Sequence, residues 1–133
     1  MKQSKILIAD DSQQHLQVLS EALCHVGCSV IAASDGERAL LTALLRVPDL
    51  ILMDTALPKL NGLAVARCLK SNPLTRCIPI IFVSSQGLAR DRVEGLRAGG
   101  VDYVVKPFYS EELLARVRIH LTLSRGHSVK PLS

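Results

Sequence analysis

The sequence predicts an α/β fold, a doubly wound parallel β-sheet with helices on both faces. Short apolar runs along the chain are nearly continuous rather than alternating, which is typical of strands that are buried on both sides. Segments whose apolar residues have helical spacing lie between these runs, so strands and helices alternate. With 133 residues, 48% of them apolar and 21% charged, the chain has the length of one domain and enough apolar side chains for one core.

Five segments are expected to form the strands. The runs at 6–9, 50–53, 79–83 and 101–105 are almost wholly apolar and too short for helices. The run at 29–33 is more polar at its margins, which suits a strand at the edge of a sheet. Strands that alternate with helices imply right-handed crossovers, and therefore a parallel sheet of the (βα)5 type.

Five helices are expected, one after each strand. The first is ended by Gly27, the second by Pro48 and the third by the Asn72-Pro73 pair. The fourth is ended by Gly99-Gly100, and the fifth starts at Ser110, which two glutamates follow. The apolar residues with helical spacing are Leu16, Leu19, Leu23 and Val26; Ala39, Leu40, Ala43, Leu44 and Val47; Leu63, Ala66 and Leu69; Val93 and Leu96; and Leu113, Leu114, Val117 and Leu121.

The two ends of the chain and its cysteines limit which class of protein this can be. Residues 1–124 are expected to form the domain, and the polar, aperiodic residues 125–133 a flexible tail or a truncated linker. No stretch without a charge exceeds 13 residues, and the apolar one at 77–89 is too short and too polar to cross a membrane. We expect a cytoplasmic protein, because no signal peptide precedes the first acidic residues and the four cysteines lack C-x-x-C spacing.

The basic charge is unevenly placed. Residues 1–75 contain seven basic and seven acidic side chains, whereas 76–133 contain nine basic and five acidic ones and supply the whole net charge of +4. A direct nucleic-acid contact is not expected, because there is no second domain for a helix-turn-helix and no aromatic stacking platform. The excess of arginine indicates instead a surface that selects an acidic partner.

Residues suited to chemistry follow four of the predicted strands. Asp10 and Asp11 follow the first strand, Asp54 the third, Ser84 the fourth and Lys106 the fifth. In an open parallel sheet, ligands bind at the carboxyl ends of the strands, so these side chains are expected to meet. Three crowded carboxylates need a cation, and hard oxygen ligands favour Mg²⁺. A metal, a lysine and a hydroxyl together are suited to holding a phosphoryl group, with Asp54 as the nucleophile.

These motifs resemble a known family. Asp10-Asp11, the segment D-T-A-L-P-K-L-N-G at 54–62, Ser84 and the segment Y-V-V-K-P-F at 103–108 are similar to the receiver domain of two-component response regulators. The resemblance covers about residues 4–124. It implies a flavodoxin-like fold with strand order 2-1-3-4-5. It also implies a phosphoacceptor signalling module of a phosphorelay, which catalyses only its own phosphorylation and dephosphorylation.

The resemblance implies a metal site and a phosphoryl donor. Asp54 would accept the phosphoryl group from a sensor histidine kinase or a histidine phosphotransfer protein. Mg²⁺ would bind Asp11, Asp54 and the backbone carbonyl of Ala56 directly, and Asp10 through water. The side chains of Ala56 and Gln86 occupy the positions that tune dephosphorylation in the family.

The resemblance also implies a switch. Lys106 and Ser84 would contact the phosphoryl group, and Tyr103 would swing inward when Ser84 moves. Pro107 would follow a cis peptide bond. The signal would leave through the fourth helix, the fifth strand and the fifth helix, toward a partner protein, a second copy in a homodimer or a covalently linked output domain. Ile119 and Leu123 lie off the core stripe of the fifth helix, which favours such a contact.

Other functions remain to be compared with this one. A scaffold of the same fold that works without phosphorylation would share every fold feature. An aspartyl-phosphate phosphatase would place its nucleophile after the first strand in a D-x-D pattern, which Asp10-Asp11 does not match. A flavin or nucleotide binder would need a phosphate-holding loop rich in Gly, Ser or Thr after the first strand, where this chain is acidic.

Overall fold

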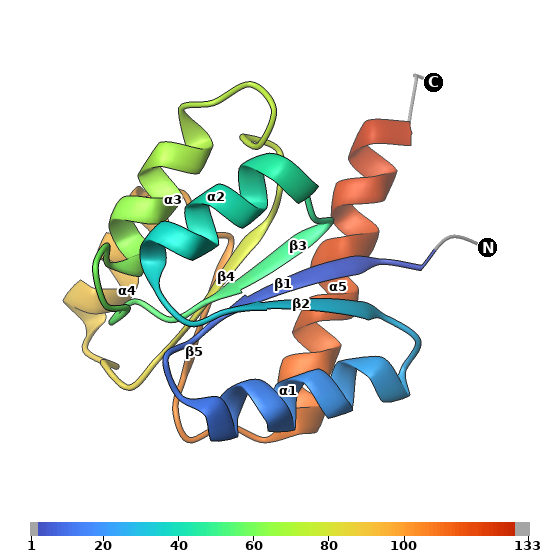
Figure 1. Ribbon diagram of the computed structural model, residues 1–133, viewed down its shortest axis with the longest axis horizontal. Helices are drawn as coiled ribbons and strands as arrows, with labels where there is room; N and C mark the ends of the chain where they lie inside the picture. The colour runs from blue at the N-terminus through green and yellow to red at the C-terminus, as the bar shows by residue number, and fades with distance from the viewer. Residues whose placement is uncertain (1–2, 130–133) are drawn as a thin grey trace.

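Strands and helices alternate through the whole structure, a computed structural model that describes residues 3–129, with side chains described as far as residue 125. Each expected element is present (Figure 1). The strands are β1 (Lys5–Ala9), β2 (Ser29–Ala33), β3 (Leu50–Met53), β4 (Ile80–Ser84) and β5 (Asp102–Val105). The helices are α1 (Gln13–His25), α2 (Gly36–Arg46), α3 (Gly62–Lys70), α4 (Ala89–Arg97) and α5 (Ser110–Val129).

The strands form one parallel sheet in the order β2-β1-β3-β4-β5, which confirms the flavodoxin-like α/β fold. Helices α1 and α5 cover one face of this sheet, and α2, α3 and α4 cover the other (Figure 1). Successive residues of each strand point to opposite faces. On β1, Leu7 and Ala9 pack in the core under α2 and α3, while Ile6 and Ile8 pack in the core under α1 and α5. The central strands β1, β3 and β4 are mainly apolar because both of their faces are covered.

Side-chain caps start three of the helices, α1, α2 and α3. Ser12, Asp35 and Asn61 each accept a hydrogen bond from the backbone N–H three residues later, at 2.8 to 3.2 Å. Such caps satisfy amide groups that have no partner within the helix. The chain therefore turns sharply at the carboxyl edge of the sheet, where the predicted site residues lie.

Two expected helix residues lie outside their helices. Val26 follows the last residue of α1 and is exposed. Val47 adopts a left-handed conformation with φ of 43°, which ends α2, and it is also exposed. Pro48 accounts for this early end, because the residue before a proline is disfavoured in the helical region.

Helix α4 packs on the sheet through a glycine rather than through its larger apolar side chains. Val93 and Leu96, whose spacing indicated this helix, are exposed, and Gly95 is the buried residue of the helix. A Cβ atom at Gly95 would lie only 2.8 Å from Cδ2 of Tyr103 on β5. The glycine thus allows a close approach of helix and strand, and it turns the apolar residues outward.

Helix α5 is longer than expected. It continues to Val129, so residues 125–129 belong to a helix rather than to the predicted tail, and residues 130–133 lie outside the described part of the chain. Gly126 costs a helix about 1 kcal/mol but does not stop it, and the first proline after it is Pro131. Ile119 and Leu123 are exposed on this helix, as predicted. Among the described residues, no helix is both long enough and apolar enough to cross a membrane.

Candidate functional site

Three carboxylates meet at the carboxyl edge of the sheet. Asp10 and Asp11 follow β1, and Asp54 follows β3. One oxygen atom from each lies within 4.8 Å of the others. Asp10 and Asp54 are buried, whereas Asp11 is exposed. The sequence-based prediction that these acids converge is therefore confirmed in the structure.

Lys106 joins two of the three acids. Its Nζ atom donates to Oδ2 of Asp10 at 2.9 Å and to Oδ2 of Asp54 at 2.8 Å. Nδ1 of His15 lies 3.2 Å from the same nitrogen. Burial alone would lower the pKa of Lys106, but the hydrogen bonds to Asp54 and Asp10 outweigh it and raise the pKa above its ordinary value of 10.5. Lys106 is therefore charged at neutral pH and partly neutralises the acids.

The backbone holds the other oxygen of each buried acid. Oδ1 of Asp10 accepts from the N–H of Ser12 at 2.9 Å, and Oδ1 of Asp54 accepts from the N–H of Ala56 at 2.9 Å. Each carboxylate is thus fixed between a main-chain amide and the lysine. All the side-chain donors of the cluster are hard oxygen atoms, so the cluster fits a divalent cation such as Mg²⁺ better than a soft metal.

Ser84 lies at the end of β4, but its hydroxyl bonds away from the acids. Its Oγ atom lies 2.7 Å from Oγ1 of Thr55, and it accepts from the N–H of Gln86 at 3.1 Å. Ser84 and Thr55 are both buried. Within the described residues, these are the hydrogen bonds of the Ser84 side chain, and none of them is made to Asp10, Asp11 or Asp54.

Tyr103 on β5 already points inward. Its ring is 7% exposed and packs near Phe82, with the ring centroids 6.2 Å apart. Its hydroxyl donates to the backbone oxygen of Gln86 at 2.6 Å. The resemblance implied that the ring swings inward when Ser84 moves, yet here the ring is inward while Ser84 is bonded to Thr55. Inward packing of Tyr103 therefore does not require a displaced Ser84. The Lys106–Pro107 peptide bond is cis.

A family model for the response regulator receiver domain matches residues 6–118. The chain belongs to this family. The response regulator ArlR of Staphylococcus saprophyticus is 42% identical over 118 residues, which make up 89% of this chain and 52% of ArlR. PleD, a response regulator of Caulobacter vibrioides, is 36% identical over 115 residues, or 86% of this chain and 25% of PleD.

Solved structures agree with this assignment. The receiver domain of the Francisella response regulator 1452 has a TM-score of 0.86 and 30% identity to this chain, and the match covers 91% of this chain and 98% of that one. The receiver domain described here spans about half or less of the length of the curated relatives that it matches.

Two residues of this receiver site were missed by the sequence analysis. Thr55 directly follows the candidate phosphoacceptor Asp54, and His15 stands in the first turn of α1 after its cap. Both are polar residues beside a strand end, so the rule that identified Asp54 could also have drawn attention to them. Their partners, Ser84 and Lys106, come from other strands and are not evident from the sequence.

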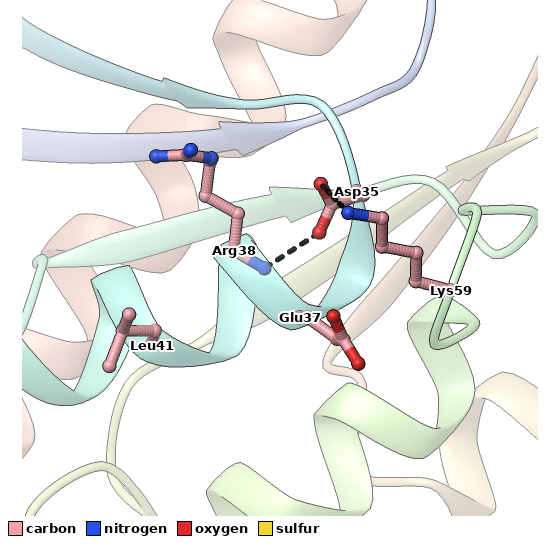
Figure 2. Close-up of a pocket in the computed structure, with 5 residues that line it drawn as sticks. All are labelled: Asp35, Glu37, Arg38, Leu41 and Lys59. Atoms are coloured by element: carbon pink, nitrogen blue, oxygen red, sulfur yellow. Dashed lines mark hydrogen bonds and ion pairs between the residues drawn. The ribbon is translucent and has the colours of Figure 1, made fainter.

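A shallow hollow lies beside the start of α2, outside the predicted site (Figure 2). Asp35 caps the helix and pairs with the ammonium group of Lys59 at 3.8 Å. The N–H of Gly36 donates to the backbone oxygen of Pro58 at 3.0 Å, and a Cβ atom at Gly36 would lie 1.6 Å from the backbone oxygen of Leu60. Only glycine permits this contact between the start of α2 and the loop after Asp54.

A second charged cluster joins β5 to α5 in the receiver domain. The carboxylate of Asp102 accepts from Nη1 of Arg116 at 2.8 Å and lies 3.1 Å from Nε2 of His120. Burial alone would raise the pKa of Asp102, but hydrogen bonds from Arg116, from the N–H of Tyr103 and from His120 hold it below its ordinary value of 3.8. The cluster ties the edge strand to the last helix.

Proposed function

We propose that this receiver domain is the phosphoacceptor of a two-component phosphorelay and that Asp54 is the residue phosphorylated. The observation that supports this best is the position of Lys106, which bridges Asp10 and Asp54 at the carboxyl edge of the sheet. A lysine between two acids is available to contact an incoming phosphoryl group, because its charge and its donors are already directed at the acceptor.

The reaction transfers a phosphoryl group from nitrogen to oxygen. A carboxylate oxygen of Asp54 attacks the phosphorus atom of a phosphohistidine on the donor protein, and the P–O bond forms as the P–N bond breaks. The electron pair of the broken bond leaves with the imidazole of the donor. Lys106 donates to the oxygens of the phosphoryl group, and Ser84 donates to them after its hydroxyl leaves Thr55.

The acids of the site would hold Mg²⁺. Asp11, Asp54 and the backbone carbonyl of Ala56 would bind it directly, and Asp10 through water. When bound, the cation neutralises the charge that gathers on the acceptor and on the phosphoryl oxygens. Asp11 supports this role, because it is the exposed carboxylate of the three and faces solvent from which a cation arrives.

The phosphoryl donor is proposed to be a sensor histidine kinase or a histidine phosphotransfer protein. A hollow beside Lys106 is lined by residues of α1 and of the segment after β5, among them Gln14, His15 and Phe108. This hollow offers a place for a donor to approach the acceptor. We propose that the domain acts on no substrate other than its own phosphoryl group. Ala56 and Gln86 would then influence only how fast that group is lost from Asp54.

The output is proposed to leave through α4, β5 and α5. Apolar side chains are exposed there, and α4 also contains the basic residues Arg90, Arg92 and Arg97. These exposed residues are Leu88, Val93, Leu96, Val101, Ile119 and Leu123. The contact would be made with an acidic partner protein, a second copy in a homodimer or an output domain linked to the receiver.

Incubation with acetyl phosphate and MgCl₂, followed by intact-mass measurement, tests the phosphoacceptor role. The wild-type protein should gain one phosphoryl group, and Asp54→Asn should gain none. Glu37→Gln is the matched control, because it removes an exposed carboxylate beside α2 and should leave the gain unchanged. If the wild type gains no phosphoryl group with this donor or with a phosphorylated histidine kinase, the scaffold function replaces the phosphoacceptor function.

A further inference from the structure

Thr55 and Ser84 form a buried pair of hydroxyl groups. Their oxygens are 2.7 Å apart, and the two residues are 6% and 1% exposed. The pairing follows from the sheet, in which Met53 of β3 is opposite Phe82 of β4. Continued by two residues, this register brings Thr55 opposite Ser84. The contact is therefore built into the sheet beside the acceptor Asp54.

The hydrogen bonds of Ser84 limit what its hydroxyl can do. The Oγ atom accepts from the N–H of Gln86, and it also shares a hydrogen bond with Thr55, in which either oxygen can be the donor. A hydroxyl has a single proton to donate. When Ser84 is the donor to Thr55, its proton is engaged in that bond, and Ser84 can donate to a phosphoryl oxygen on Asp54 only by giving up the bond to Thr55. The Thr55 hydroxyl then loses its partner in a buried place, which is unfavourable.

We propose that Thr55 is a positioning residue that holds Ser84 in its resting place and opposes activation of the receiver. This inference rests on the proposed phosphoacceptor function of Asp54. The Thr55–Ser84 hydrogen bond lowers the free energy of the resting state. In the activated state, in which Ser84 contacts the phosphoryl group, Thr55 no longer makes this hydrogen bond. Thr55 therefore weakens the response to phosphorylation without touching the phosphoryl group itself.

The same bond reaches the output face. Ser84 accepts from the N–H of Gln86, and the backbone oxygen of Gln86 accepts from the hydroxyl of Tyr103 on β5. These hydrogen bonds, joined through the backbone of Gln86, thus link Thr55 to Tyr103. Because the ring of Tyr103 is already packed inward, activation requires only the movement of the Ser84 side chain. The hydrogen bond from Thr55 opposes that movement.

The affinity for beryllofluoride in MgCl₂ tests the proposal, since this phosphoryl mimic binds an acceptor aspartate. Titrations followed by tyrosine fluorescence or by NMR should show that Thr55→Val, which keeps the shape but loses the hydroxyl, binds the mimic about fivefold more tightly than the wild type. That factor corresponds to one net hydrogen bond. Thr55→Ser, which keeps the hydroxyl, should restore the wild-type affinity. Thr75→Val is the matched control, because Thr75 is a buried hydroxyl outside the site and bonds the backbone oxygen of Leu69.

A double-mutant cycle separates positioning from a general packing effect. In the Ser84→Ala background the hydroxyl that Thr55 holds is gone, so Thr55→Val should no longer tighten binding. Equal or weaker binding by Thr55→Val, or the same gain in the Ser84→Ala background, would overturn the proposal while the wild type still binds the mimic. If Thr55→Val does not fold, Thr55→Ala is compared in the same cycle. Failure of the wild type to bind at all would instead overturn the phosphoacceptor function, and the positioning role with it.

Discussion

Replacing Lys106 by methionine should destabilise the protein strongly when no divalent cation is present. The lysine side chain is 15% exposed, and its two charge-assisted hydrogen bonds, at 2.9 and 2.8 Å, are made to acids whose side chains are 3% and 9% exposed. Removing one partner of a buried ion pair costs about 3–5 kcal/mol, because the remaining charges lose their compensation. Since the site is open to solvent at Asp11, we expect the lower end of that range, about 3 kcal/mol.

Magnesium should offset much of this loss. Lys106→Met leaves three carboxylates within 4.8 Å of one another without the ammonium group, so a cation is bound more tightly than in the wild type. A ligand that binds only the folded state at a hundred times its Kd adds about 2.7 kcal/mol to the free energy of unfolding. The difference between variant and wild type should therefore be large in chelator and small in saturating MgCl₂.

Urea unfolding followed by circular dichroism, in chelator and in MgCl₂, measures both effects. Lys59→Met is the control, because Lys59 pairs with Asp35 at 3.8 Å and its side chain is 62% exposed (Figure 2). An exposed pair of this kind contributes about 0–1 kcal/mol. The reasoning would be refuted if Lys106→Met were no less stable in chelator than Lys59→Met, or if MgCl₂ stabilised the variant and the wild type equally.

Three further predictions concern the framework of the site. In an exposed helix, replacing glycine by alanine adds about 1 kcal/mol of stability. Gly95→Ala should add none here, because the new methyl group displaces the ring of Tyr103. Unchanged NMR shifts of that ring would contradict this. Asp102→Asn should lower stability at neutral pH, and its unfolding free energy should change less between pH 5 and pH 2 than that of the wild type. The reason is that the lowered pKa of Asp102 contributes stability that is fully present above pH 3.8 and is lost as the pH falls below that value. Parallel acid-unfolding curves for the variant and the wild type would argue against the pairing of Asp102 with Arg116. Gly36→Ala should cost about 3 kcal/mol or more in urea unfolding, because its Cβ atom would collide with a backbone oxygen of the loop after Asp54 rather than with a movable side chain; a loss below 1 kcal/mol would be inconsistent with the contact.

Much of the fold was predictable because the signals are local. The continuous apolar runs at 50–53 and 79–83 correspond to β3 and β4, which are buried on both faces. The run at 29–33, with its polar margins, corresponds to β2 at the edge of the sheet. Helix ends at Gly27 and Pro48 followed from backbone preferences that act within one or two residues. The strand order, by contrast, came from the resemblance to receivers and not from any periodicity in this chain.

Helix α4 shows where local patterns are insufficient. The spacing of Val93 and Leu96 predicted the helix itself, yet both side chains are exposed and Gly95 is the buried residue that meets Tyr103 of the sheet. Helical spacing identifies a face but does not say which neighbour the face meets. The close fit of Gly95 against Tyr103 belongs to a pair of elements and has no signal in either one alone.

The sequence alone determined the alternation of strands and helices and the positions of Asp10, Asp11, Asp54, Ser84 and Lys106 at strand ends, because periodicity and strand ends are properties of neighbouring residues. Only the tertiary structure decided the partners of these groups: Lys106 between Asp10 and Asp54, and Ser84 with Thr55 instead of with Asp54. Those partners depend on the register between strands far apart in the chain and on burial that removes water as a competing partner. For this receiver domain, the sequence therefore indicated which polar groups gather at the carboxyl edge of the sheet, and the packing of the sheet set the hydrogen bonds that they make.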